Sequence, residues 1–119
     1  MTSGKRNISI GKILERRHAT LVPGAPNALF ARIIEDLGFE AIYVTGAGIA
    51  NMQLGAPDIG LTTLTEIAYN VTCIAEAVQI PLIVDADTGF GNTQNCYRSI
   101  RLLERSGASA IQLEDQVFP

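Results

Sequence analysis

Four short apolar runs, separated by amphipathic helical patterns, restrict what this chain can fold into more than any other feature of its sequence. We expect strands at residues 20–22, 41–45, 81–85 and 110–114. Strands that alternate with helices are typical of a parallel sheet whose connections are right-handed crossovers. The sequence therefore predicts an α/β fold, which is either an open doubly wound sheet or a (β/α)₈ barrel.

Capping residues mark the helices between these strands. A short helix over residues 8–17 precedes the first strand, and Asn27 is a good N-cap for the next helix. Thr63 and Glu66 fit a capping box, and Asn92 or Thr93 caps the last helix, which Gly107 ends. We expect these helices to bury Leu29, Phe30, Ile33, Ile34 and Leu37, then Ile67, Val71, Ile74 and Val78, then Tyr97, Ile100, Leu102 and Leu103.

Polar residues follow each predicted strand. The clusters are Pro23-Gly24, Thr45-Gly46-Ala47, Asp85-Ala86-Asp87 and Glu114-Asp115. The carboxyl ends of parallel strands form the face on which both architectures place their sites. A loop over residues 46–62 follows the second strand, and long loops in compact domains are usually functional. We therefore expect a functional site at this face.

Asp85 and Asp87 are the clearest candidates for chemistry. Side chains two residues apart on a strand point to the same face, so the two carboxylates repel each other unless a cation lies between them. Mg²⁺ suits this position because it takes oxygen ligands and usually keeps several waters. The alternative is that Asp87 caps the next helix and Asp85 is solvated at the end of a strand.

The composition excludes other classes of function. The chain has 119 residues, enough for one domain, and a net charge of −3. The sequence has no basic stripe of the kind that binds nucleic acid. We expect Arg98, Arg101 and Arg105 to form a solvated face. No apolar run is long enough to span a membrane. Cys73 and Cys96 have no metal-ligand spacing, which favours reduced thiols in a cytoplasmic protein.

Five segments in order resemble the isocitrate lyase/phosphoenolpyruvate mutase superfamily. They are residues 23–29, 43–48, 55–60, 85–91 and 112–116. The likeness is closest to its short-chain members, such as 2-methylisocitrate lyase, oxaloacetate decarboxylase and carboxyphosphonoenolpyruvate phosphonomutase. It implies the barrel rather than the open sheet. Residues 1–119 would then be a partial domain, the N-terminal half of a (β/α)₈ TIM barrel, which stops before the catalytic lid.

The resemblance also implies roles for individual residues. The metal ligands would be Asp85, Asp87 and Glu114, holding Mg²⁺ or alternatively Mn²⁺. The catalytic acids would be Asp58 and Glu114. The substrate-binding residues would be Tyr43, Thr45, Gly46, Ala47 and Asp85. Family members commonly have serine at position 45 and often glycine at position 47, so this chain keeps a hydroxyl group and a backbone N–H there.

The implied activity is a Mg²⁺-dependent lyase that cleaves a carbon–carbon bond in small 2-oxo or 2-hydroxy carboxylates, or a relative that rearranges a phosphorus–carbon bond. The longer parent would be a homo-oligomer, a tetramer in this family. One alternative is an aldol enzyme that resembles ketopantoate hydroxymethyltransferase. Another is an inactive truncated or split fragment that serves in assembly. The family's lid supplies a cysteine that neither Cys73 nor Cys96 matches, so we expect no turnover by this chain alone.

Overall fold

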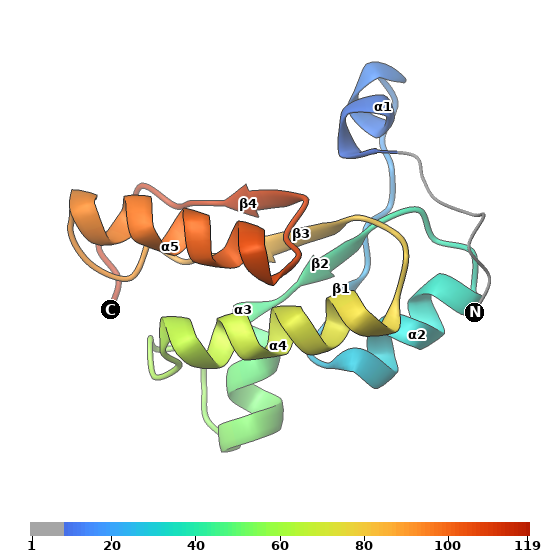
Figure 1. Cartoon of the computed structure of the whole chain (residues 1–119). Coiled ribbons are helices and arrows are strands. Elements are labelled where there is room, and N and C mark those ends of the chain that lie inside the picture. The colour runs from blue at the N-terminus through green and yellow to red at the C-terminus, as the bar shows by residue number, and fades with distance from the viewer. Residues whose placement is uncertain (1–8) are drawn as a thin grey trace.

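Four parallel strands lie side by side in chain order in the computed structural model, which describes residues 9–119 (Figure 1). They are β1 (Gly24–Ala25), β2 (Ile42–Val44), β3 (Leu82–Asp85) and β4 (Ala110–Gln112). In the register of the sheet Tyr43 pairs with Ile83, and Asp85 pairs with Gln112. The predicted parallel α/β arrangement is therefore confirmed. β1 and β4 are the edges of the sheet within the described residues.

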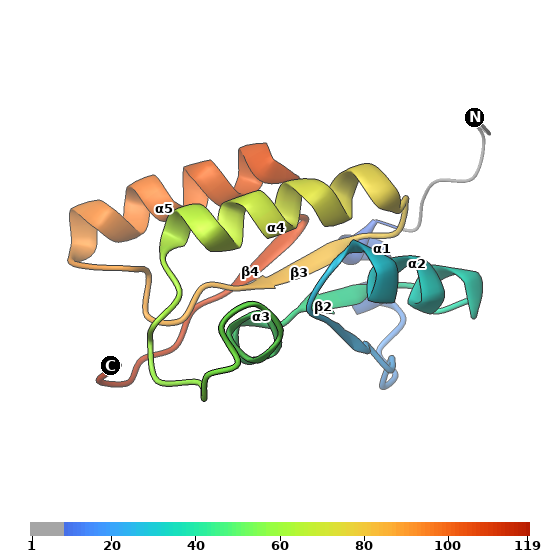
Figure 2. The ribbon, with the colours of Figure 1, turned by 90° about the horizontal axis from the view of Figure 1, so that it is seen from below.

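The helices are α1 (Ile10–Glu15), α2 (Ala28–Asp36), α3 (Gly46–Ile49), the π-helix η1 (Ala50–Leu54), α4 (Leu64–Ala77) and α5 (Thr93–Ser106). α4 and α5 contact each other and cover the same face of the sheet, as Figures 1 and 2 show. Within residues 9–119 no helix combines the length and the apolar character needed to cross a bilayer.

The predicted helix caps are present. The Asn27 side chain accepts a hydrogen bond from the Phe30 amide over 3.0 Å. Thr63 and Glu66 form a reciprocal capping box at the start of α4. Asn92, rather than Thr93, caps α5, and Gly107 ends that helix with a φ of 114°. These local interactions fix where the two long helices begin and so how they lie on the sheet.

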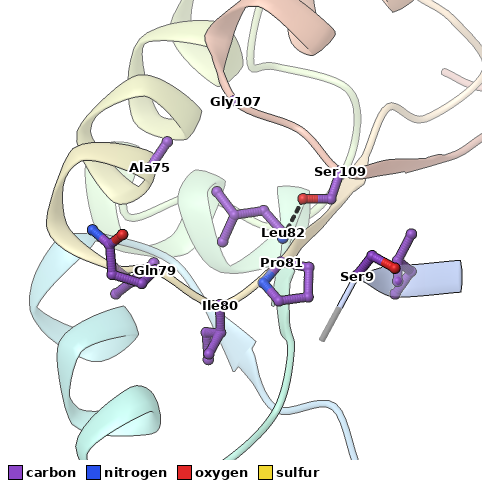
Figure 3. A pocket seen from close by; sticks show the side chains of 10 residues that line it. Ser9, Ala75, Gln79, Ile80, Pro81, Leu82, Gly107 and Ser109 are labelled. Atoms are coloured by element: carbon purple, nitrogen blue, oxygen red, sulfur yellow. Dashed lines mark hydrogen bonds between the residues drawn. The ribbon is translucent and has the colours of Figure 1, made fainter. Parts of the chain in front are cut away.

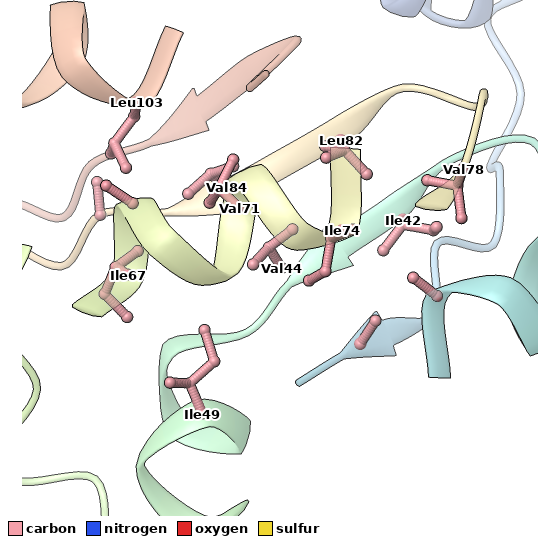
Figure 4. Packing of buried hydrophobic residues seen from close by; sticks show 14 of the residues in the cluster. Ile42, Val44, Ile49, Ile67, Val71, Ile74, Val78, Leu82, Val84 and Leu103 are labelled. Carbon is pink, nitrogen blue, oxygen red and sulfur yellow. The ribbon is translucent and has the colours of Figure 1, made fainter. Parts of the chain in front are cut away.

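The core lies between α4 and the two central strands. Figure 4 shows Val71 and Ile74 of α4 directed toward Val44 and Val84 of the sheet. The predicted stripe of α4 is fully confirmed, because Ile67, Val71, Ile74 and Val78 are all buried. Each such side chain contributes about 1.5–3 kcal/mol when it leaves water. The opposite face of the sheet carries the alternate residues, which include Tyr43 and Asp85 and stay half-buried.

Two predictions about the chain between these elements were wrong. The first strand is not at residues 20–22 but at Gly24–Ala25, where we expected a turn. Pairing with β2 decides its position, and the Leu21 side chain is left 73% exposed. The expected loop after β2 begins instead with α3 and η1, because Thr45 provides an N-cap for a helix of small residues.

The predicted buried faces of α2 and α5 were wrong in part. α2 contacts β1 and α4, and the residues of α2 that are buried are Ala31 and Ile34. In α5 the buried residues are Ser99 and Leu103, and Leu102 is half-buried. The apolar residues that we expected inside but that are exposed are Leu29, Phe30, Ile33, Leu37, Tyr97 and Ile100.

Candidate active site

The turn after β3 brings two carboxylates together. The Gly89 amide donates to the Ala86 carbonyl over 2.8 Å, which reverses the chain immediately after the strand. Asp87 lies in this turn with a φ of 46°, in the left-handed region that aspartate tolerates better than most residues. Asn92 caps α5, so the alternative role of Asp87 as the helix cap is excluded. The turn therefore sets the direction of the Asp87 side chain.

Gly46 marks the point at which these carboxylates converge. A Cβ atom at Gly46 would lie 3.1 Å from Asp85 Oδ2 and 3.7 Å from Asp87 Oδ1. The Gly46 amide donates to Asp85 Oδ2 over 3.2 Å, and the Asp87 amide donates to Asp85 Oδ1 over 3.1 Å. Asp85 is thus held by two backbone groups, and the absence of a side chain at residue 46 leaves room for it.

The start of α3 presents a backbone amide to the same region. Thr45 Oγ1 accepts a hydrogen bond from the Gly48 amide over 3.1 Å. The Asp85 carboxylate accepts a hydrogen bond from the Gly46 amide. The Ala47 amide, between Gly46 and Gly48 in this first turn, is bonded to neither the Asp85 nor the Thr45 side chain. The Thr45 hydroxyl, for which the resemblance implied substrate binding, is used here to cap the helix.

Glu114 reaches this site because β3 and β4 stay paired beyond their ends. The Ala86 amide donates to the Gln112 carbonyl over 3.1 Å, and the Glu114 amide donates to the Asp87 carbonyl over 2.9 Å. The Gln116 side-chain amide donates to the Glu114 carboxylate. Glu114 therefore lies beside Asp87, and Gln116 holds it there. Sequence reasoning gave Gln116 no role, because its contact depends on how the chain turns after β4.

The electrostatics of the site are those of a group of acids. Burial, and then the charges of Asp85, Asp58 and Glu114, raise the pKa of Asp87 to about 6. Burial, and then the charge of Asp85, raise the pKa of the Tyr43 phenol to about 12. Asp58 itself is exposed in the segment after η1. Asp85, Asp58 and Glu114 thus act on Asp87, and the combined negative charge of these four acids favours a bound cation.

The donor set fits a hard cation only if water completes the coordination. No three Asp, Glu, His or Cys side chains among residues 9–119 are arranged closely enough to hold a metal ion by themselves. Two carboxylates, Asp85 and Asp87, approach the same point beside Gly46. Mg²⁺ commonly binds through one or two carboxylates and keeps several waters. The chemistry of these residues therefore suits Mg²⁺.

A cavity of about 240 Å³ opens beside Asp87. Its lining residues are Gly60, Thr62, Asp87, Thr88, Phe90, Gly91, Phe118 and Pro119. Thr62 is buried and was not predicted, because nothing in its local sequence distinguishes it. A larger cavity of about 410 Å³ lies at the other end of the sheet, where Pro81 and Ser109 precede β3 and β4 (Figure 3). That cavity is remote from the acids.

Solved structures with this fold define the class of protein. A crystal structure of oxaloacetate acetylhydrolase is similar with a TM-score of 0.84 and 35% identity, covering 92% of this chain and 39% of that one. A phosphonopyruvate hydrolase in complex with oxalate and Mg²⁺ is similar with a TM-score of 0.83 and 35% identity, covering 89% of this chain and 37% of that one. Another neighbour, 2,3-dimethylmalate lyase, is described as a member of the PEP mutase/isocitrate lyase superfamily.

The chain belongs to the phosphoenolpyruvate phosphomutase family, which matches residues 11–118. The 2,3-dimethylmalate lyase of Eubacterium barkeri is 46% identical over 91% of this chain and 37% of its own length. The 2-methylisocitrate lyase of Aeropyrum pernix is 48% identical over 91% of this chain and 35% of its own length. The resemblance inferred from the five segments is confirmed. The chain spans little more than a third of these relatives.

Proposed function

We propose that this chain is the N-terminal part of a Mg²⁺-dependent lyase that cleaves a carbon–carbon bond in a small 2-oxo or 2-hydroxy carboxylate. The observation that carries this proposal is the pair Asp85 and Asp87 at the carboxyl end of β3, in a chain of this family. The relatives named as lyases support this chemistry, and the neighbour that contains oxalate and Mg²⁺ supports the metal.

The substrate would be held by groups that carry no negative charge. With a pKa of about 12, the Tyr43 phenol keeps its proton at neutral pH. It would donate that proton in a hydrogen bond to a substrate oxygen once substrate takes the place of its present partner, Asp85. The Ala47 amide offers a second donor at the start of α3, where the helix dipole favours an anion. Thr45 then acts on the substrate indirectly, by fixing this turn through its bond to Gly48.

Asp85 and Asp87 would hold the metal, with Glu114 reaching it directly or through water. When bound, Mg²⁺ supplies positive charge that stabilises the enolate left by carbon–carbon cleavage. Asp85 keeps a fixed orientation because two backbone amides donate to its carboxylate oxygens. We assign proton transfer to Asp58 and Glu114, whose charges both act on Asp87. Gln116 orients Glu114 for that role.

The whole protein would hold the remaining strands of the barrel and the lid, since the relatives are nearly three times as long. We expect that protein to be a cytoplasmic homo-oligomer. Residues outside this chain would select among substrates. For the 119-residue chain alone we expect metal binding without turnover. Measurable Mg²⁺-dependent cleavage of 2-methylisocitrate, 2,3-dimethylmalate or oxaloacetate by the chain alone would contradict this expectation.

Replacement of Asp87 tests the proposal. In the longer parent, Asp87→Ala should abolish Mg²⁺-dependent cleavage of the same three substrates, whereas Asp36→Ala, at an exposed position of α2, should leave it unchanged. In the 119-residue chain, electron paramagnetic resonance of added Mn²⁺ should show binding that Asp87→Ala removes. Equal turnover in the parent and its Asp87→Ala variant would refute the metal assignment. Metal binding without any lyase activity in the parent would favour the inactive assembly fragment.

A further inference from the structure

The backbone of the turn between β3 and α5 is unusual. Among residues 9–119 three residues other than glycine have a positive φ, and two of them, Asp87 and Phe90, lie in this turn with values of 46° and 61°. Gly89 and Gly91 also have positive φ values, of 99° and 141°. Most of the residues from 87 to 91, which we call the 87–91 turn, therefore have a backbone that side chains disfavour.

Phe90 is the residue in this turn whose type does not suit its conformation. Glycine adopts a positive φ freely and aspartate tolerates it, but a bulky aromatic residue in this region is an outlier. Such strain persists only where the surrounding structure determines the backbone more strongly than the residue's own preference does, and it is common at active sites. Contacts outside its own backbone must therefore hold Phe90.

These contacts come from the core and from α5. The half-buried Phe90 side chain packs against the core cluster. A Cβ atom at Gly89 would lie 2.8 Å from Cys96 Sγ, and one at Gly91 would lie 2.6 Å from Asn95 Cγ. Both neighbours of Phe90 thus lie directly on the first turn of α5. The conformation of the turn is therefore fixed by the packing of α5 and the core around it.

The turn connects Phe90 to the acids of the candidate site. Asp87 lies three residues before Phe90, and its carbonyl oxygen accepts a hydrogen bond from the Glu114 amide over 2.9 Å. Asp87 and Phe90 also line the same cavity of about 240 Å³. A change in the backbone at residue 90 would therefore displace Asp87 and loosen its bond to Glu114.

We propose that Phe90 is a positioning residue for the candidate metal site. Its ring, packed against the core, holds the 87–91 turn in the conformation that places Asp87 beside Glu114. In this role Phe90 contacts neither the cation nor the substrate. The inference rests on the proposed function, because it takes Asp87 as a metal ligand. It adds that affinity for the cation depends on an apolar side chain that has no ligand atom.

Substitutions at residue 90 test this role in the 119-residue chain. Phe90→Gly removes the ring and frees the backbone, so Mn²⁺, followed by electron paramagnetic resonance, should bind about tenfold more weakly, as expected when metal ligands lose the groups that orient them. Phe90→Tyr keeps the ring and should bind as the wild type does. Phe39→Gly is the matched control, because Phe39 is also half-buried against the core cluster but lies before β2. It should lower stability and leave the affinity unchanged.

Hydrogen exchange separates positioning from a general loss of stability. The Glu114 amide should exchange faster in Phe90→Gly, relative to the Ser109 amide, which donates to the Leu82 carbonyl over 2.8 Å at the other end of the same pair of strands. Global unfolding exposes both amides, so a loss of overall stability should not raise the Glu114 rate relative to that of Ser109. If circular dichroism shows that Phe90→Gly does not fold, Phe90→Leu takes its place, with changes expected in the same directions.

The outcomes distinguish this inference from the proposed function. Absence of Mn²⁺ binding by the wild type would overturn both. Where the wild type binds Mn²⁺, three results would each overturn the positioning role of Phe90 and leave the metal assignment in place. They are an unchanged affinity in Phe90→Gly, an unchanged ratio of the two exchange rates, and an equal loss of affinity in Phe90→Tyr or Phe39→Gly.

Discussion

The backbone amide of Glu114 donates a hydrogen bond to the carbonyl oxygen of Asp87 over 2.9 Å. This bond extends the pairing of β3 and β4 past the last residue of either strand. Asp87 and Glu114, which follow strands separated in sequence by the whole of α5, are therefore held side by side. A divalent ion bound there would meet groups that are already placed, so little conformational entropy would be lost on binding.

Gly46→Ala should weaken divalent-ion binding while leaving the fold intact. The added methyl group would lie 3.1 Å from Asp85 Oδ2 and would displace that carboxylate. Residues that orient metal ligands typically change affinity by about 10–100-fold, and we expect the lower end of this range. Mn²⁺ titration followed by electron paramagnetic resonance measures the change. Gly11→Ala, in α1, is the matched control, since its new Cβ would meet only Ser9 Oγ at 3.8 Å. An unchanged affinity in Gly46→Ala would contradict the placement of the metal.

Asp87→Asn should stabilise the fold at neutral pH but not in acid. The pKa of Asp87 in the folded chain is about 6, above its ordinary value of 3.8, because the carboxylate is partly buried beside other acids. A raised pKa means that the folded state binds the proton more tightly, so the stability from this group is complete below about pH 4 and is lost as the pH rises to about 6.

Asparagine resembles the protonated acid, so the variant should not show this loss. The difference in melting temperature between Asp87→Asn and wild type should therefore grow from about pH 4 to about pH 7. Circular dichroism in EDTA measures it, because a bound cation would favour the ionised form. Asp36→Asn, on the exposed surface of α2, serves for comparison. A difference that stays constant over this range would argue against the raised pKa.

Ser99→Ala should loosen the turn that carries the acids. The buried Ser99 hydroxyl lies 2.8 Å from the carbonyl oxygens of both Gly89 and Asn95, and so ties α5 to the turn after β3. Loss of a buried partner costs about 1–3 kcal/mol of unfolding free energy, measured in urea. Ser106→Ala is the matched control because its hydroxyl donates only to Leu102 within the same helix. We also expect faster hydrogen exchange over residues 86–91 in Ser99→Ala alone; equal effects of the two variants would count against this link.

Thr63→Ala should destabilise the folded chain without changing the arrangement of the acids in the candidate active site. Thr63 and Glu66 satisfy each other's backbone amides at the start of α4, with distances of 2.7 Å and 3.3 Å. Loss of an N-cap side chain typically costs about 1 kcal/mol. Urea unfolding should show this loss, whereas Thr65→Ala, at an exposed position two residues along the same turn, should change stability by less than about 0.5 kcal/mol. If the two variants unfold alike, α4 does not depend on its capping box.

α4 was predicted residue by residue because all of its signals are local. The capping box lies within four residues, and the stripe from Ile67 to Val78 needs only a helical period to be read. α2 was predicted less well. Its apolar residues cover more than one face, and the contact with α4 selects the side that contains Ala31. Tertiary packing of this kind has no signature in the local sequence, and the same is true of β1, whose position depends on its pairing with β2.

Within the site, the approach of the Asp85 and Asp87 carboxylates to the same point was predicted, but for an incomplete reason: β3 ends at Asp85, and the left-handed turn rather than the period of a strand directs Asp87. The roles of Thr62 and Gln116 were not predictable in this way. Thr62 lines the cavity beside Asp87 from a segment 25 residues earlier in the sequence. Gln116 reaches Glu114 only because the chain bends after β4. Contacts between distant segments require the folded chain, whereas Asp85 and Asp87 are close enough in sequence for a local pattern to indicate that they lie together.

The left-handed backbone of Asp87 restricts which amino acids a library randomised at codon 87 can return. A φ of 46° disfavours β-branched and bulky residues whatever the enzyme's chemistry, and admits Gly, Asn and Asp most readily. Selection for folding alone should therefore enrich these three, and selection for turnover should retain aspartate among them. Comparing the two enriched pools would separate what the turn demands of this position from what the reaction demands of it.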